Sequence, residues 1–407
     1  MLPSAMLVAA KSLRTSMHGA VAVLGADSPI GLTIVRELGA RGVGVIAMGR
    51  SQRALARFSR HSADFGLIEG PLADWLPEWI AQRDVAAIFA TSEGLLLELA
   101  ALKDQLGKCQ VLSPDQARLD LVLDKARTLA AAQALGIAVP SSWQPQAGDD
   151  LAARADEIAY PVAVKWADPN AVMAPLEHAG LALEKVEYAQ DAAALLAILS
   201  RYDGIGQYPL VQQYCPGVGL GQMFNMAGGK ATLRFQHQRL REFPPSGGVS
   251  SMCRSVPLDQ HGELMAKSEA LLAALGWEGP AMVEYRHDPA SGQSWLMEIN
   301  GRFWGSIPLA WHCGAHFAWE HYRLAVKGEA PGPVKGPLRQ RRARYVIPDA
   351  KHIVLVLRDG SLSLTRRIAA LGRWVVDFLD PRVRYYVWTL SDPGPFFGDI
   401  WGILRGW

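Results

Sequence analysis

The stretch 282–306, MVEYRHDPASGQSWLMEINGRFWGS, decides how this chain is interpreted. Its runs MVEY and LMEIN alternate apolar and polar residues, which indicates two strands, and HDPASGQ between them carries the Asp-Pro and Ser-Gly signals of a hairpin turn. Residues two apart in a strand point the same way, so Glu298 and Asn300 share one face. If the hairpin pairs in register, Glu284 lies across from them.

These side chains have the chemistry of a metal and phosphate site. Two carboxylates and one carboxamide offer hard oxygen ligands, which suit Mg²⁺ that keeps waters and takes its other ligands from nucleotide phosphates. Arg302 is permanently charged and forked, so it suits phosphate oxygens. The small and apolar residues 301–306 do not resemble an exposed edge. We therefore predict a metal site; the alternative is a solvated hairpin whose acids face water.

The segment resembles the last motif of the ATP-grasp superfamily, especially the branch like the large subunit of carbamoyl phosphate synthetase. The resemblance covers residues 20–325 and is strongest in the hairpin. It implies that Glu284, Glu298 and Asn300 bind two magnesium ions, for which Mn²⁺ can substitute. It also implies that Arg302 contacts the γ-phosphate of ATP or an acyl-phosphate intermediate.

Composition and charge narrow the class of protein. The 407 residues are 50% hydrophobic and 20% charged, which is ordinary for a globular protein of two or three domains. A net charge of +2 with mixed signs does not favour nucleic acid as a partner. The four cysteines are far apart, residues 1–18 lack the apolar core of a signal peptide, and no apolar run has membrane-spanning length. We therefore expect a cytoplasmic protein.

The predicted fold class is α/β and α+β with several domains. Residues 20–48 read as strand, glycine turn, helix and strand, and 86–91 supply a later strand of the same parallel sheet. We predict a poorly defined amino terminus at 1–18 and a Rossmann-like pre-ATP-grasp domain at 19–115. A two-lobed ATP-grasp domain follows at 116–330, with its smaller lobe at about 140–212, and then an extension at 335–407. Arg50 after the second strand leaves NADP binding as an alternative, although the glycine spacing is weak.

Three lysines are predicted to bind ATP. Lys125 follows an aspartate in a helical segment, 113–140, that resembles the ATP-grasp entry segment; its alternative is a solvated helix lysine. Lys165 lies inside the apolar strand YPVAVKWAD, where a charge is costly unless a partner such as phosphate neutralises it. Lys185, in ALEKVEYA, is the third candidate for contact with the nucleotide.

The adenine is predicted to lie against a hinge. In PLVQQYCPGVGLGQ the resemblance places Gln212, Gln213 and Tyr214 beside the base. The acids that many relatives use for the ribose are absent, and no ribose-binding residue is assigned. The segment 167–185 holds one glycine, so the glycine-rich flap that covers phosphates in the family is not evident.

Two further arginines are predicted to face the reacting phosphate. The segment 234–256 places basic residues around a Pro-Pro-Ser-Gly-Gly turn, and it resembles an ATP-grasp motif that faces phosphate and acceptor. Arg239 and Arg241 are the catalytic candidates, since bidentate arginine suits phosphate and carboxylate. The alternative for such a charge run is a solvated face. His237 is predicted to be structural.

The extension is predicted to begin with a hairpin or small sheet at 342–360 and to continue as a helix at 361–379. The last 34 residues contain Trp374, Trp388, Trp401 and Trp407 with arginines nearby. Such mixing marks a membrane surface or a protein interface. The alternative is a helix and tail that cap the core.

Together these features predict an ATP- and Mg²⁺-dependent carboxylate-amine ligase that releases ADP. Its partners would be a small-molecule carboxylate and an amine or other nucleophile, which the sequence does not identify. One alternative is a non-catalytic nucleotide-binding relative that acts as a scaffold or membrane-associated partner. Another is an NADP-dependent reductase built on the amino-terminal domain.

Overall fold

The computed structural model describes residues 19–167, 169–184, 186–245, 247–332 and 338–404. Contacts within the chain divide it into two compact units. The larger unit comprises Met1–Asp124, Leu220–Glu284 and Ile299–Trp407, and the smaller comprises Lys125–Gly219 and Tyr285–Glu298. The smaller unit thus contains the predicted smaller lobe and extends beyond it at both ends. The predicted amino-terminal domain shares the larger unit with strands from the second half of the chain.

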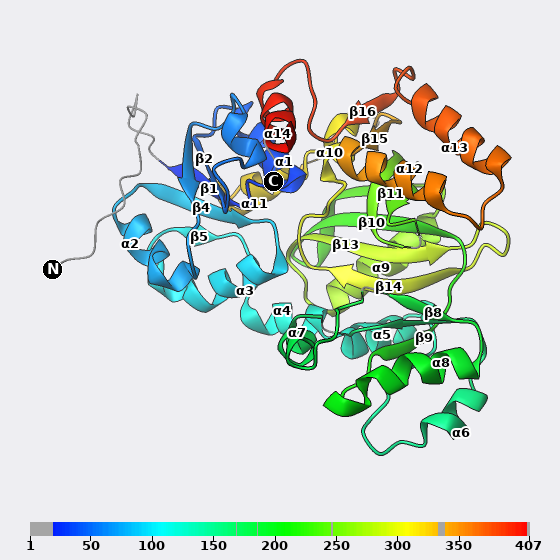
Figure 1. Cartoon of the computed structure of the whole chain (residues 1–407). Coiled ribbons are helices and arrows are strands. Elements are labelled where there is room, and N and C mark those ends of the chain that lie inside the picture. The colour runs from blue at the N-terminus through cyan, green and yellow to red at the C-terminus, as the bar shows by residue number, and fades with distance from the viewer. Residues whose placement is uncertain (1–18, 168, 185, 246, 333–337, 405–407) are drawn as a thin grey trace. The chain divides into compact units, whose positions relative to one another are not determined.

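The larger unit begins with a parallel sheet of five strands in the order β3-β2-β1-β4-β5, seen at the blue end of the chain in Figure 1. Every residue of β1 is buried, because the sheet is covered on both faces, and such strands are continuous apolar runs. The Rossmann-like prediction is confirmed. The strand bounds are β1 Ala20–Leu24, β2 Val45–Gly49, β3 Asp64–Leu67, β4 Val85–Ala90 and β5 Gln110–Val111.

The helices around this sheet begin where the sequence supplies caps. Ser28 accepts a hydrogen bond from the Gly31 amide, and Pro29 occupies the first turn of the first helix. Ser92 caps the third helix in the same way. The bounds are α1 Pro29–Gly39, α2 Leu76–Ala81, α3 Glu93–Leu102 and α4 Gln116–Leu123. Short 3₁₀ turns lie at Leu55–Phe58, Leu72–Asp74 and Lys103–Gln105.

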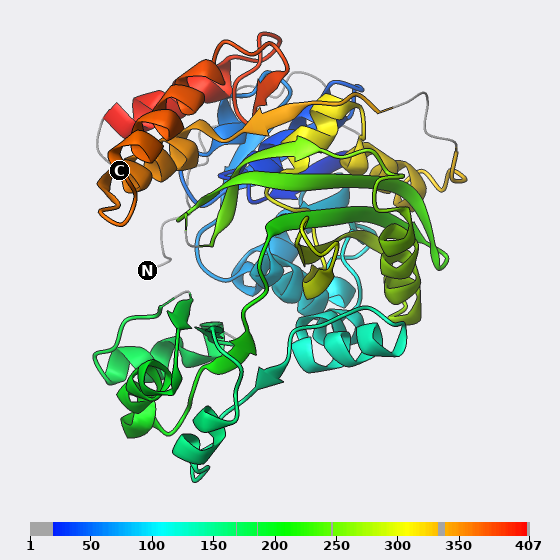
Figure 2. The same ribbon diagram turned by 90° about the vertical axis from the view of Figure 1, so that its right-hand side faces the viewer.

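A second sheet has seven strands in the order β14-β13-β10-β11-β12-β15-β16, and most of its residues belong to the larger unit. Its long central strands β10 and β11 are prominent in Figure 2. The strand bounds are β10 Val218–Ala227, β11 Lys230–Phe243, β12 Val249–Ser255, β13 Gly279–His287, β14 Ser294–Asn300, β15 Arg342–Arg344 and β16 Val383–Tyr385. The helices that accompany it are α9 Gly262–Ala274, α10 Ile307–Cys313 and α11 Phe317–Ala325. A continuous core joins the two sheets of this unit, because α10 and α11 pack against α1.

The smaller unit holds a sheet of four strands in the order β6-β9-β7-β8. The strands are β6 Ser142–Trp143, β7 Val162–Lys165, β8 Glu187–Ala189 and β9 Leu210–Gln213. The helices are α5 Lys125–Ala134, α6 Leu151–Asp156, α7 Pro169–His178 and α8 Ala192–Leu199, with a 3₁₀ turn at Ser200–Ile205. Val162 and Val164 face the core of this unit together with Leu195 and Val211.

The carboxy-terminal extension corrects one prediction. Only β15 adds a strand at 342–360; the remainder is α12, Val346–Arg358, and not a hairpin. Asp349 and Ile353 are buried four positions apart, so tertiary contacts on one face of a helix override the strand preference of the Ile and Val residues. The predicted helix at 361–379 is confirmed as α13, Leu364–Val376, and α14 follows at Gly394–Leu404.

Candidate functional site

The predicted hairpin is present, with β13 next to β14 in the seven-stranded sheet. Glu284 lies on β13, and Glu298 and Asn300 lie on β14. Both glutamates are half-buried and Asn300 is buried. Glu298 and Asn300 are two apart on a regular strand, so they project to the same side of it.

Arg239 holds the carboxylate of Glu284. It lies on β11, and its Nη2 is 2.6 Å from Glu284 Oε2. Its Nη1 also contacts Glu242 Oε1 at 3.2 Å and the Gly248 carbonyl oxygen at 3.1 Å. A guanidinium shared between two carboxylates in a half-buried setting is fixed in orientation. The structure therefore brings Arg239 and Glu284 together, as the sequence predicted for members of one site.

Arg302 contacts the predicted amide ligand, Asn300, as Arg239 contacts Glu284. Its Nη2 donates to Asn300 Oδ1 at 3.0 Å, and its Nε lies 3.2 Å from Glu93 Oε1. Glu93 is the first residue of α3, and the sequence analysis did not select it. The available signal was the Thr-Ser-Glu sequence directly after β4, because side chains at the carboxyl end of a parallel strand commonly line a site.

The donor atoms fit the predicted metal. All three predicted ligands offer oxygen, as Mg²⁺ and Mn²⁺ require. Within the described parts of the chain, no group of three His, Cys, Asp or Glu side chains could hold a metal ion. The predicted set has two carboxylates and an amide, so it depends on water and phosphate for its remaining ligands.

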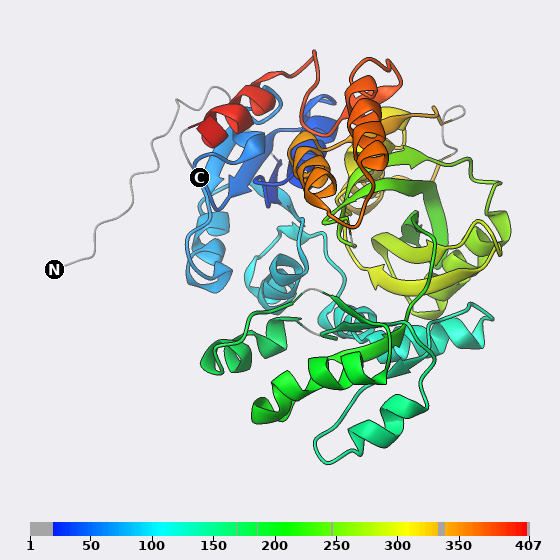
Figure 3. The same ribbon diagram turned by 45° about the vertical axis from the view of Figure 1, so that its right-hand side comes forward.

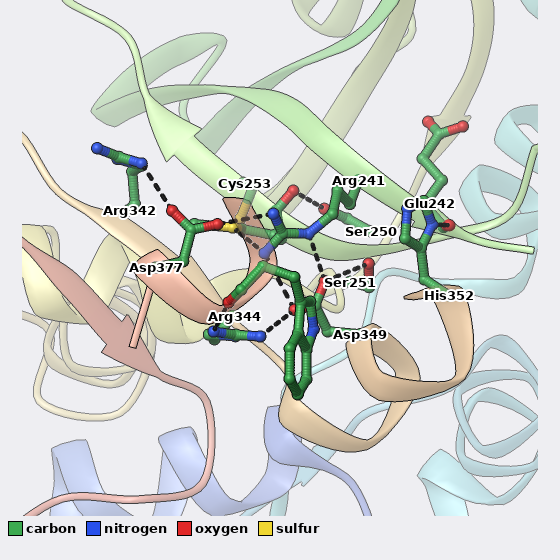
Figure 4. Close-up of polar contacts among 12 residues, drawn as sticks. Arg241, Glu242, Ser250, Ser251, Cys253, Arg342, Arg344, Asp349, His352 and Asp377 are labelled. Atoms are coloured by element: carbon green, nitrogen blue, oxygen red, sulfur yellow. Dashed lines mark hydrogen bonds and ion pairs between the residues drawn. The ribbon is translucent and has the colours of Figure 1, made fainter. Parts of the chain in front are cut away.

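Arg241 has different partners from Arg239. Its Nε is 2.7 Å from Asp349 Oδ1 on α12, and its Nη1 is 2.7 Å from Asp377 Oδ2, directly after α13 (Figure 4). Burial opposes the charge, yet Asp349 and Asp377 raise the pKa of Arg241 above its ordinary value. The guanidinium of Arg241 is ion-paired with two carboxylates of the carboxy-terminal extension. These contacts favour a structural role for Arg241 over the predicted catalytic one.

A strand irregularity explains this separation. The pairing of β11 with β12 shifts register on both sides of Arg241: Arg239 pairs with Cys253, and Arg241 pairs with Met252. Such bulges interrupt the alternation of side chains and re-aim them. In a regular strand, Arg239 and Arg241 would share a face.

Two of the three predicted lysines can be placed within the smaller unit. Lys125 begins α5, and its Nζ donates to the Ala167 carbonyl oxygen at 3.2 Å. Lys165 ends β7 and is half-buried, because alternation points it away from the core that Val162 and Val164 enter. Burial raises the pKa of the nearby Cys215 thiol to about 11, and the positive charge of Lys165 acts in the opposite direction. Lys185 lies outside the described residues.

The predicted adenine hinge forms the end of β9 in the smaller unit. Gln212 is buried, its Nε2 donates to Ser142 Oγ at 3.0 Å, and its Oε1 has no partner among the described residues. Gln213 accepts from the Ser141 amide at 3.2 Å. Tyr214 is exposed and meets the ring of Tyr188 edge-on, with ring centroids 5.7 Å apart. Tyr188 on β8 was not predicted, since pairing between distant strands places it there.

A helix occupies the position of the flap. Where the family has a glycine-rich loop after the lysine strand, this chain forms α7 over Pro169–His178. The low glycine content of this segment is consistent with a helix. The segment that the sequence resemblance assigns to the flap is thus helical over Pro169–His178.

A separate cavity of about 470 Å³ lies in the larger unit and is lined in part by Arg254, Arg341 and Arg382. Arg254 donates to Gln238 Oε1 at 2.9 Å. Gln238 alternates along β11 with Arg239, so the cavity lies on the other face of this strand from the Arg239–Glu284 pair. It is not part of the candidate site.

Comparison of the sequence with family models and with curated proteins finds no match. Solved structures match at low identity. One is an ADP complex of N5-carboxyaminoimidazole ribonucleotide synthetase: TM-score 0.63 and 12% identity over 83% of this chain and 84% of that chain. L-amino acid ligase from Bacillus licheniformis matches with TM-score 0.57 and 15% identity over 81% and 80%.

A third match is the biotin carboxylase domain of 2-oxoglutarate carboxylase from Hydrogenobacter thermophilus, solved with MgADP, ADP and bicarbonate. Its TM-score is 0.60, with 14% identity over 79% of this chain and 72% of that chain. At these identities the matches establish the fold. The amino-terminal parallel sheet followed by antiparallel sheets agrees with them. The chain therefore has the ATP-grasp fold.

Proposed function

We propose that this chain is an ATP- and Mg²⁺-dependent ligase that activates a carboxylate as an acyl phosphate and joins it to an amine or another nucleophile. The observation that carries the proposal is the pairing of two predicted metal ligands with two arginines: Arg239 with Glu284, and Arg302 with Asn300. The ATP-grasp fold supports it, because the matched structures include an L-amino acid ligase and a complex with MgADP.

Arg239 and Arg302 would change partners when nucleotide binds. Without nucleotide, Arg239 neutralises Glu284 and Arg302 occupies an oxygen of Asn300. Polyphosphate is a stronger partner for a forked guanidinium, so we propose that both arginines turn to phosphate when ATP binds. This exchange releases Glu284 and Asn300 as ligands. Bound Mg²⁺ would supply charge neutralisation at the transferring phosphoryl group.

The proposed reaction has two steps. A carboxylate oxygen of the substrate forms a bond to the γ-phosphorus, the bond from that phosphorus to the β–γ bridging oxygen breaks, and ADP leaves. The nucleophile then attacks the carbonyl carbon, loses a proton to solvent, and displaces phosphate. Arg302 would hold the negative charge on the transferring group, a contribution that needs positioning rather than an enzyme nucleophile.

The nucleotide contacts are proposed for the smaller unit. Lys125 and Lys165 would bind the phosphates, since each places an ammonium at the start of a helix or the end of a strand. The ring pair formed by the half-buried Tyr188 and the exposed Tyr214, with the backbone after Gln213, would receive the adenine. We also propose a cytoplasmic enzyme, because the four cysteines are buried free thiols.

A second candidate function is nucleotide binding without chemistry. The observation that favours it is α7, which replaces a phosphate-covering loop with a helix. Such a protein would bind ATP with magnesium and release no ADP in the presence of any acid or amine. The same assay separates the two candidates.

The test measures ADP release with Mg²⁺ and ATP across a panel of carboxylic acids paired with amines, with hydroxylamine added in parallel. Hydroxylamine converts an acyl phosphate to a hydroxamate, which reports the first step alone. Glu298→Gln keeps the shape of the side chain and removes its charge, so we expect turnover to fall by at least about 100-fold. Glu263→Gln, on the exposed face of α9, is the matched control and should retain activity.

Substrate-dependent ADP release with hydroxamate formation, lost in Glu298→Gln and kept in Glu263→Gln, supports the ligase. Full activity of Glu298→Gln contradicts the metal assignment. ATP binding without ADP release on any substrate pair favours the second candidate.

A further inference from the structure

Helix α13 exposes an apolar stripe. Within α13 no residue is buried. Leu364, Ile368, Leu371 and Val375 are 68%, 60%, 38% and 48% exposed, and their spacing of four, three and four positions aligns them along one side of the helix. Scattered single apolar residues on a surface need no explanation, but a contiguous stripe marks an interaction site.

The stripe stays exposed because other side chains of α13, and residues directly after it, contact the sheet. Trp374 and Phe378 pack on the buried guanidinium of Arg344, whose Cζ lies 5.0 and 3.9 Å from the two ring centroids. Asp377 binds Arg241 at 2.7 Å and Arg342 at 3.1 Å. The helix is thus fixed to the sheet by one side, so the exposure of the other side is built into the fold. Figure 3 shows α12 and α13 side by side at this edge of the larger unit.

The exposed charges around the stripe are mostly basic. Between Val346 and Val376 the basic side chains are Lys351, Arg358, Arg366, Arg367 and Arg373. The only acids in this range are Asp349, which is buried in ion pairs, and Asp359, in the loop between the helices. Arg366 and Arg373 project from the side of α13 away from the stripe, as the polar face of an interfacial helix does.

We infer that α13 docks the protein on an anionic lipid bilayer, lying in the interface with its stripe in the acyl boundary and its arginines among the phosphates. Apolar area and basic charge act together in such binding. A second copy of this chain is the less favourable occupant, because it would bring the same basic side chains against themselves. Thirteen residues rise only about 20 Å as a helix, and none of the described helices could cross a membrane. This inference does not depend on the proposed ligase activity.

The test is flotation of the full chain with vesicles of phosphatidylcholine and phosphatidylglycerol, compared with vesicles of phosphatidylcholine alone. We expect binding to the anionic vesicles. Ile368→Glu with Val375→Glu should weaken it by about tenfold or more, since both side chains lose their burial in lipid. Met173→Glu with Leu183→Glu is the matched control: it adds the same charge at exposed apolar positions of the smaller unit and should bind normally.

A second variant tests whether the basic side chains contribute to binding of anionic lipid. Arg366→Gln with Arg373→Gln should weaken binding to anionic vesicles by about fivefold per arginine and reduce its sensitivity to salt. Circular dichroism confirms that each variant is folded. Equal binding to both kinds of vesicle contradicts the role of charge. Failure to bind either kind overturns the inference, as does a dimer in light scattering that Ile368→Glu with Val375→Glu dissociates.

Discussion

His237 is an enclosed imidazole beside the candidate site. Its Nδ1 lies 2.6 Å from Ser306 Oγ, and its Nε2 has no partner among the described residues. Burial, reinforced by the charge of Arg239, lowers the pKa of His237 to about 3. The ring is therefore neutral in the folded protein, which agrees with the predicted structural role and excludes it as a proton donor near neutral pH.

This pKa gives a prediction about stability. The unfolded chain binds a proton on His237 below its ordinary pKa of 6.5, and the folded protein does not until about pH 3. Stability is therefore lost as pH falls from 6.5 towards 3, by about 1.4 kcal/mol per pH unit for this one group. His237→Asn should flatten the dependence of unfolding free energy on pH by that amount, measured in urea between pH 6.5 and 4.5. An unchanged slope would contradict the assignment.

The sequence predicted some residues of the site and missed others for a physical reason. Glu284, Glu298 and Asn300 follow from alternation within one hairpin, which is local. The partners of Arg241 lie 108 and 136 residues away along the chain, and no local pattern indicates them. Arg239 and Arg241 were predicted alike from their residue type and their place before the glycine turn, and strand register separates them.

At the scale of elements, the hairpin depends on a close approach between two segments. Gly301 follows β14 and separates Asn300 from Arg302, and a Cβ there would lie 2.5 Å from the ring of Trp277. Trp277 is itself buried, and its Nε1 donates to the Pro280 carbonyl oxygen at 3.3 Å. The ring therefore fixes the path of the chain at the end of the predicted metal-binding strand.

Gly301→Ala should destabilise the protein by about 1–3 kcal/mol, because it overpacks a site that cannot expand. Gly305→Ala, four positions further, meets no atom within 4 Å and is the control. Denaturant unfolding of Gly301→Ala, Trp277→Phe and the double variant forms a cycle. We expect the smaller ring to recover part of the loss; additive losses would show that the two residues do not interact.

Element types were predictable where patterns are strong. The strands β1, β2 and β4 are apolar runs and were predicted from the sequence, as was the helix α13; β3 and β5, which are short and less apolar, were not predicted. Helix α12 was mistaken for part of a hairpin or small sheet because IVLVL favours strands locally, whereas Asp349 is buried on one face of a helix against Arg344 and against Arg241, 108 residues away.

At the scale of the whole molecule, the extension is fastened by ion pairs. Asp349 joins Arg241 and Arg344, and Asp377 joins Arg241 and Arg342. Removing one partner of a buried pair leaves an uncompensated charge. Since Arg241 and Arg239 share β11, the extension and the candidate site are built on one strand.

Asp349→Asn should therefore lower the free energy of unfolding by about 3–5 kcal/mol. Asp359→Asn, in the exposed loop between α12 and α13, should change it by no more than about 0.5 kcal/mol. Thermal and denaturant unfolding measure both. A small effect of Asp349→Asn would mean that packing, and not charge, holds the extension in place.

The ion pairs also constrain how this chain can change over generations. While α12 and α13 are in place, a substitution that removes Asp349 or Asp377 alone leaves a buried guanidinium with too few partners. Replacement of Arg241 or Arg344 alone likewise leaves a buried carboxylate unmatched. We therefore expect these four residues to change together over generations rather than one at a time.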